Sequence, residues 1–66
     1  MTRQFAVWTP HRSRFWTVRV TGDADAIKAA HAAAEVVEDA TGYDAMPVEP
    51  TPVGNAHANY RIEVPA

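Results

Sequence analysis

The sequence predicts an α+β fold in which one helix packs on a three- to four-stranded antiparallel sheet, in the order β-β-α-(β)-β. Residues 23–41 alone show sustained helical periodicity, and aromatic and β-branched runs with strand alternation lie on either side. At 66 residues, we expect one domain spanning residues 1–66, with a thin core. The chain has no cysteine, so partner binding or self-association is the expected extra source of stability.

A β-hairpin is predicted at about residues 3–21. Residues 3–9 and 15–21 are rich in aromatic, Val and Thr residues, which favour a pleated surface. Pro10 ends the first run because it has no N–H for a ladder hydrogen bond, and a polar turn follows it. If the register brings Trp8 and Phe15 together, they form an aromatic patch on the face that a single helix leaves uncovered. The inward face of the whole sheet is predicted to carry Phe5, Val7, Trp16, Val18, Val20, Tyr60, Ile62 and Val64.

A helix is predicted at about residues 23–41. Asp23 follows Gly22 and is a good N-cap, because its carboxylate can accept hydrogen bonds from the free N–H groups of the first turn. Alanine-rich sequence gives high helix propensity. Gly42 is a natural stop. The buried stripe is expected at Ile27, Ala30, Ala34, Val37 and Thr41, widened by Ala26, Ala33 and Ala40.

A proline-rich connection, residues 43–56, follows the helix. Its prolines exclude a helix or a central strand, but a short edge strand near residues 45–49 is compatible with them. Gly54 and Asn55 predict a turn. The last strand is expected at about residues 57–64, where apolar and polar side chains alternate.

Charge is distributed unevenly along the chain, although the net charge is only −2. Residues 1–22 carry four arginines and no acid, whereas residues 23–49 carry seven acids and one lysine. Such asymmetry bears on partners rather than on the fold. The candidate partner-binding residues are Trp8, His11, Arg12, Arg14, Phe15 and Arg19. A second candidate surface is the acidic helix face of Glu35, Glu38 and Asp39.

Each candidate surface has a simpler interpretation. The basic hairpin is also what a solvated turn with core aromatics would look like, and acids on an exposed helix face are ordinary. The two surfaces would be complementary across a homodimer. The hairpin could instead bind phosphates and stack bases, but an acidic chain argues against nucleic acid as the main partner.

No catalytic motif is present in the sequence. There is no glycine-rich phosphate loop, paired-carboxylate motif or nucleophile elbow, and the histidines His11, His31 and His57 lack ligand spacing. We therefore expect no enzyme, no cofactor and no metal site. Neither a signal-peptide core nor a run of about 20 apolar residues occurs, which favours a cytoplasmic protein.

The run VRVTGDADAIKAAHAAAEVVEDATGYDAMPVEP covers about half of the chain. Its order of strand, alanine-rich helix, Thr-Gly-aromatic and proline-bounded strand resembles small uncharacterised proteins of high-GC actinobacteria and their phages. The resemblance implies an accessory protein that modulates a host or phage complex, and it carries over no functional residues. The leading hypothesis is a non-enzymatic protein–protein interaction module, expected to be a homodimer. The alternative is a nucleic-acid-binding module that uses the basic aromatic hairpin.

Overall fold

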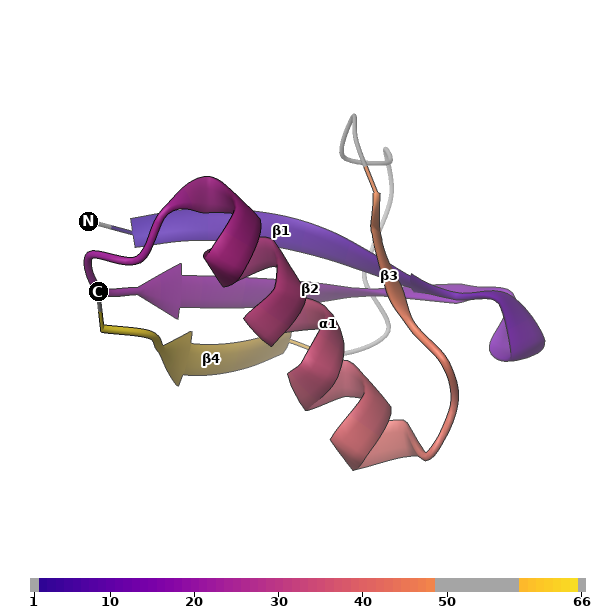
Figure 1. Ribbon diagram of the computed structural model, residues 1–66. Helices are drawn as coiled ribbons and strands as arrows, with labels where there is room; N and C mark the ends of the chain where they lie inside the picture. Colours follow the sequence, from indigo (N-terminus) through magenta and orange to yellow (C-terminus); the bar gives the residue numbers. More distant parts are fainter. Residues whose placement is uncertain (1, 49–58, 66) are drawn as a thin grey trace.

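The computed structural model describes residues 2–48 and 59–65, which form one sheet with a helix across one of its faces (Figure 1). This confirms the predicted α+β class and the order of elements along the chain. The elements are β1 (Thr2–Thr9), the 3₁₀ turn η1 (Pro10–Arg12), β2 (Arg14–Thr21), α1 (Ala26–Thr41), β3 (Met46–Val48) and β4 (Asn59–Glu63).

The sheet has the strand order β3-β1-β2-β4. β1 pairs with β2 in an antiparallel hairpin that runs from Thr2 opposite Thr21 to Thr9 opposite Arg14. The short edge strand predicted after the helix is present as β3, antiparallel to β1. β4 pairs with β2 in the parallel direction, so the prediction of a wholly antiparallel sheet is wrong. Alternation of side chains fixes which face a strand buries, but it does not fix the direction in which the strand runs.

A buried hydrogen-bond chain closes the hairpin. The Trp16 indole N–H donates to Thr9 Oγ1 at 3.1 Å, and the Thr9 hydroxyl donates to the Arg14 carbonyl oxygen at 3.1 Å. Thr9 has no solvent exposure, so these bonds satisfy polar groups that would be costly to bury alone. Ser13 completes the turn in the left-handed conformation, and its N–H donates to the Pro10 carbonyl oxygen at 3.2 Å.

The helix begins later than predicted. Asp25, not Asp23, is the N-cap, and its carboxylate accepts from the Lys28 N–H at 2.8 Å. The residues before the helix are hydrogen-bonded to the chain just after β4 instead: the buried Ala24 donates its N–H to the Val64 carbonyl oxygen at 3.4 Å. The predicted stop at Gly42 is confirmed, since its N–H donates to the Glu38 carbonyl oxygen at 2.8 Å.

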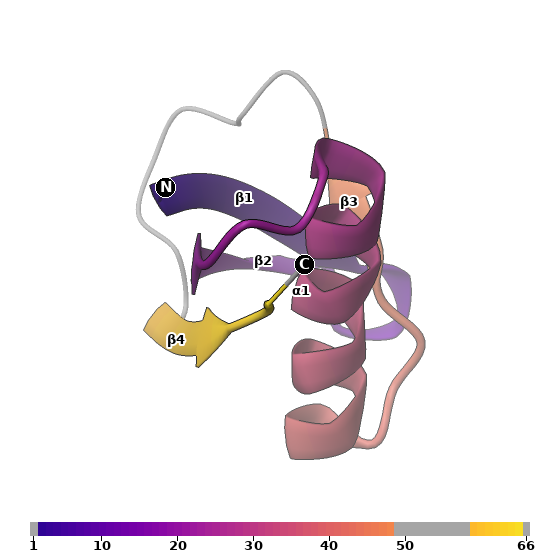
Figure 2. The ribbon, with the colours of Figure 1, turned by 60° about the vertical axis from the view of Figure 1, so that its left-hand side comes forward.

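The core lies between α1 and the inner face of the sheet (Figure 2). From the sheet, Val7, Trp16, Val18 and Val20 are buried, and Phe5, Tyr60, Ile62 and Val64 pack against them, as the strand alternation predicts. From the helix, the buried side chains are Ala29, Ala33, Ala34 and Val37.

The predicted helix stripe is partly wrong. Ile27 is 74% exposed, Ala26 and Ala40 are also exposed, and Ala30 and Thr41 are half-buried. The buried face is turned toward Ala29 and away from Ile27 by about half a residue position or less. Alanine occupies most of the helix surface, so the apolar period alone does not determine which alanines turn inward. The predicted Gly54–Asn55 turn and the start of the last strand at residue 57 lie outside the described residues.

The corner between β2 and α1 depends on Gly22. Its φ is +117°, and a Cβ atom placed there would fall on the carbonyl group of Val64. This carbonyl accepts from Ala24, and the Val64 N–H donates to the Thr21 carbonyl oxygen at 2.8 Å. The absence of a side chain at Gly22 therefore allows Val64, just after β4, to form hydrogen bonds with both Thr21 and Ala24.

The core assignment predicts the effect of shortening Val18, which is fully buried. Val18→Ala should lower the free energy of unfolding by about 1–4 kcal/mol, because it removes buried methyl groups and leaves a cavity. Urea denaturation followed by circular dichroism measures the change. Ile27→Ala is the matched control on the exposed side of the helix and should change it by about 0.5 kcal/mol or less. Equal losses would contradict the observed orientation of α1.

The two left-handed glycines predict a second contrast. Gly22→Ala meets both an unfavourable φ and the Val64 backbone, whereas Gly42→Ala, at a φ of +77°, meets no atom within 4 Å. Gly42→Ala should cost about 1–2 kcal/mol of stability for the left-handed backbone, and Gly22→Ala should cost clearly more. Denaturation of both variants side by side tests this. Similar stabilities would mean that β4 can be displaced from Gly22 without loss.

Candidate functional site

The face of the sheet opposite α1, called the outer face here, collects the polar and aromatic side chains that alternate with the core residues. Because successive side chains of a strand point to opposite faces, the paired registers place one set on this side. Its members are Thr2, Gln4, Ala6, Trp8, Phe15, Thr17, Arg19, Thr21, Met46, Val48, Asn59, Arg61 and Glu63.

One end of the outer face is apolar. Trp8 lies opposite Phe15 in the β1–β2 register, which meets the condition set for the predicted aromatic patch, and Met46 of β3 is the partner of Trp8 on its other side. Both aromatic residues are half-buried, and Met46 is 50% exposed. Three large apolar side chains from three strands therefore adjoin one another on this face.

The other end of the outer face is cationic. The parallel register sets Arg61 of β4 beside Arg19 of β2, and Gln4 of β1 is the partner of Arg19 on its other side. Neighbouring strands are about 4.8 Å apart, so two exposed arginines leave the sheet from adjacent positions on the same face. The arginine pocket, a cavity of about 270 Å³, is lined by Gln4, Thr17, Arg19, Asn59, Tyr60 and Arg61.

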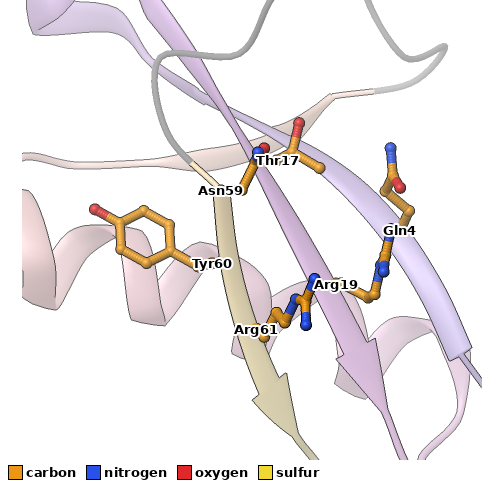
Figure 3. Close-up of a pocket in the computed structure, with 6 residues that line it drawn as sticks. All are labelled: Gln4, Thr17, Arg19, Asn59, Tyr60 and Arg61. Atoms are coloured by element: carbon orange, nitrogen blue, oxygen red, sulfur yellow. The ribbon is translucent and has the colours of Figure 1, made fainter.

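Figure 3 shows how these side chains lie. Arg19 and Arg61 are next to each other on the sheet, and the ring of Tyr60 points away from them, to the side of α1. Tyr60 instead packs its ring 5.9 Å from that of Trp16 in the core. None of the lining residues within the described part of the chain is a carboxylate. A carboxylate of the outer face, Glu63, is at the position paired with Thr21.

The hairpin tip uses its cations differently from the prediction. The Arg12 guanidinium lies 5.4 Å from the centre of the Tyr43 ring and donates to the Tyr43 hydroxyl oxygen at 3.4 Å, while the His11 ring centre is 5.9 Å from the same ring. Arg14 lines a separate cavity of about 180 Å³ with Arg12, Trp16, Thr41 and Tyr43. These cations thus gather at the end of α1.

The structure therefore divides the predicted binding residues between two places. Trp8, Phe15 and Arg19 share the outer face, whereas His11, Arg12 and Arg14 belong to the tip beside Tyr43. Sequence reasoning missed Gln4, Asn59 and Arg61. Alternation already placed Asn59 and Arg61 on the polar side of their strand, but the parallel pairing that sets Arg61 beside Arg19 gives no signal in the sequence.

The acidic helix face is only partly free for binding. Glu35 and Asp39 are exposed, but Glu38 is half-buried and its Oε2 accepts from the Ala45 N–H at 3.3 Å. This contact ties the chain after α1 back to the helix, which gives Glu38 a structural role in the turn toward β3.

No protein-family model, no curated protein and no solved structure matches this chain. Across residues 2–48 and 59–65, no group of three or more His, Asp or Glu side chains is arranged to hold a metal ion. Within that same part of the chain, no helix has the length and apolar composition needed to cross a membrane.

The side-by-side arginines predict a stability effect that depends on salt. Like charges on adjacent strands repel, so Arg61→Gln should raise the urea midpoint at low ionic strength. The increase should disappear near 1 M salt, where the screening length is about 3 Å. Lys28→Gln removes the same charge from the helix and should give no such increase. An Arg61→Gln effect that is independent of salt would show that the two guanidinium groups do not interact.

Proposed function

We propose that this protein is a non-enzymatic protein-interaction module whose outer face binds an acidic segment of a partner protein. The observation that carries the proposal is the pair of exposed arginines, Arg19 and Arg61, in a polar pocket on the sheet face that α1 leaves uncovered. Such a module would suit an accessory protein that modulates a larger complex.

Charge complementarity supports an acidic partner. Like charges at paired positions of adjacent strands repel each other, and an anion bound between Arg19 and Arg61 would offset that repulsion. Each offers a planar fork of N–H donors that matches a carboxylate in two parallel hydrogen bonds. The lining residues that the structure describes include no carboxylate, so one from a partner would relieve the repulsion.

The apolar end of the face supports a partner that is more than a single anion. Phe15 lies four residues before Arg19 on β2 and on the same face, a separation of about 13 Å at 3.3 Å per residue. An extended partner segment of about four residues could contact both ends. Trp8, Phe15 and Met46 would add burial of apolar area, and aromatic side chains are enriched where interfaces derive most of their binding energy.

A second candidate function is binding of single-stranded nucleic acid. Aromatic and arginine side chains on one sheet face are the combination that stacks bases and neutralises phosphates. The acidic charge of the chain as a whole, −2, disfavours it, because nucleic-acid-binding domains are usually basic. Titration with an acidic peptide and with single-stranded nucleic acid separates the two candidates.

The proposal predicts arginine-dependent binding of acidic peptides. A short peptide that alternates glutamate with aromatic residues should quench or shift the tryptophan emission on titration, and Arg19→Gln or Arg61→Gln should weaken binding about 10-fold each. Lys28→Gln, which removes the same charge from the far side of the molecule, should leave the affinity unchanged. Equal affinities for all three variants would contradict the proposal.

Two further outcomes of this experiment point elsewhere. Tighter binding of single-stranded DNA or RNA than of the peptide, rising steeply as salt is lowered, would favour the second candidate function. Self-association in light scattering, abolished by Glu35→Gln and Asp39→Asn together, would instead identify a second copy as the acidic partner, as the homodimer hypothesis expects.

A further inference from the structure

We infer that the arginine pocket binds a phosphate monoester group, and that the partner segment is recognised in its phosphorylated form. We take the phosphate to belong to a phosphorylated serine or threonine of a partner protein, and this part of the inference rests on the proposed function. The described residues that line the pocket belong to β1, β2 and β4, so these side chains stand on three paired strands.

The first argument is the number of donors. By their side-chain chemistry, the two arginines, Gln4, Asn59 and Thr17 offer about fifteen N–H and O–H donors around one cavity. An ionised carboxylate presents only two accepting oxygens, with about four lone-pair sites between them. A phosphate monoester presents three strongly accepting terminal oxygens, so it can use both guanidinium forks and still accept from an amide or hydroxyl.

The second argument is the balance of charge. Arg19 and Arg61 bring two positive charges onto adjacent strand positions, and no carboxylate is among the lining residues of 2–48 and 59–65. A carboxylate neutralises one of these charges. A phosphate monoester carries about −1.5 to −2 at neutral pH, which matches both. The ligand that removes the repulsion completely is therefore a dianion.

The third argument is the shape of the guanidinium group. Arginine is the preferred partner of phosphate where planar, two-point recognition matters, and lysine acts only as a point charge. Arg19 and Arg61 are the charged side chains among the described residues that line the pocket. Substitution by lysine should therefore keep the attraction but lose part of the preference for phosphate.

The test uses three peptides of the same acidic sequence that differ at one position, which holds phosphoserine, glutamate or serine. Calorimetric titration of the intact protein should give about 10-fold tighter binding of the phosphoserine peptide than of the glutamate peptide. The ratio should fall toward 1 in Arg19→Gln and Arg61→Gln and to an intermediate value in Arg19→Lys. Lys28→Gln should keep the full ratio, and circular dichroism checks that every variant is folded.

The affinity of each peptide measured over a pH series gives a second readout, because a general weakening of acidic-peptide binding would affect both peptides alike. The second pKa of a phosphate monoester is about 6. Between pH 7.5 and 5.5 the phosphoserine peptide therefore loses part of its dianion and should bind more weakly, while the glutamate peptide should change little.

Different failures are distinguishable. Equal, arginine-dependent affinities for the phosphoserine and glutamate peptides would leave the proposed function standing and overturn the phosphate inference. If no peptide binds but inorganic phosphate alone still shifts the NMR signals of the Arg19 and Arg61 side chains, phosphate binding by the pocket is supported and a protein as its source is overturned. Absence of binding by every peptide and by inorganic phosphate overturns both.

Discussion

The parallel pairing of β4 with β2 is the interaction on which the core and the candidate site both depend. It is fixed at one end by the hydrogen bond from the Val64 N–H to the Thr21 carbonyl oxygen, at a corner where Gly22 leaves no Cβ to obstruct the approach. On the inner face this pairing brings Tyr60 and Ile62 against the buried valines. On the outer face it sets Arg61 beside Arg19. One backbone constraint therefore determines both the packing and the electrostatics.

The alanine-rich helix packs against the inner face of the sheet alone. Small side chains at Ala29, Ala33 and Ala34 allow α1 to lie close to the sheet, so that a few valines and aromatic rings fill the space between them. A single helix covers one face, and a sheet needs one buried face to be stable. The helix thus supplies one side of the core, and the arginine pocket lies on the strands.

The distribution of cations changes the functional interpretation of the hairpin. In the sequence, His11, Arg12 and Arg14 look like the centre of a basic binding site. In the structure, Tyr43 contacts His11 and Arg12, which gives these residues a role in holding the tip against the end of α1. Arg19, the most distant arginine of the predicted set from the turn, becomes central because β4 supplies a second arginine beside it.

The sequence by itself determined the elements and the faces. The alternation in the β1 and β2 segments was enough to predict the large apolar side chains that these strands turn inward, but the placing of Trp8 beside Phe15 stayed conditional on the register. It also predicted the helix, its stop at Gly42 and a short edge strand after it. These features depend on local spacing and backbone preference, which a single segment contains.

Only the tertiary structure decided the direction of β4, the N-cap at Asp25, the exposure of Ile27 and the pairing of Arg19 with Arg61. Each depends on contacts between segments far apart in the chain. Asp25 rather than Asp23 caps the helix, because Ala24, between them, is hydrogen-bonded to Val64 just after β4. Ile27 is exposed because several alanine-rich faces of α1 are nearly equivalent in hydrophobicity, so the sequence did not select one. Local patterns contain no information about which distant strand pairs with β2 or in which direction it runs. The parallel pairing of β4 with β2 is what places Arg61 beside Arg19 in the pocket.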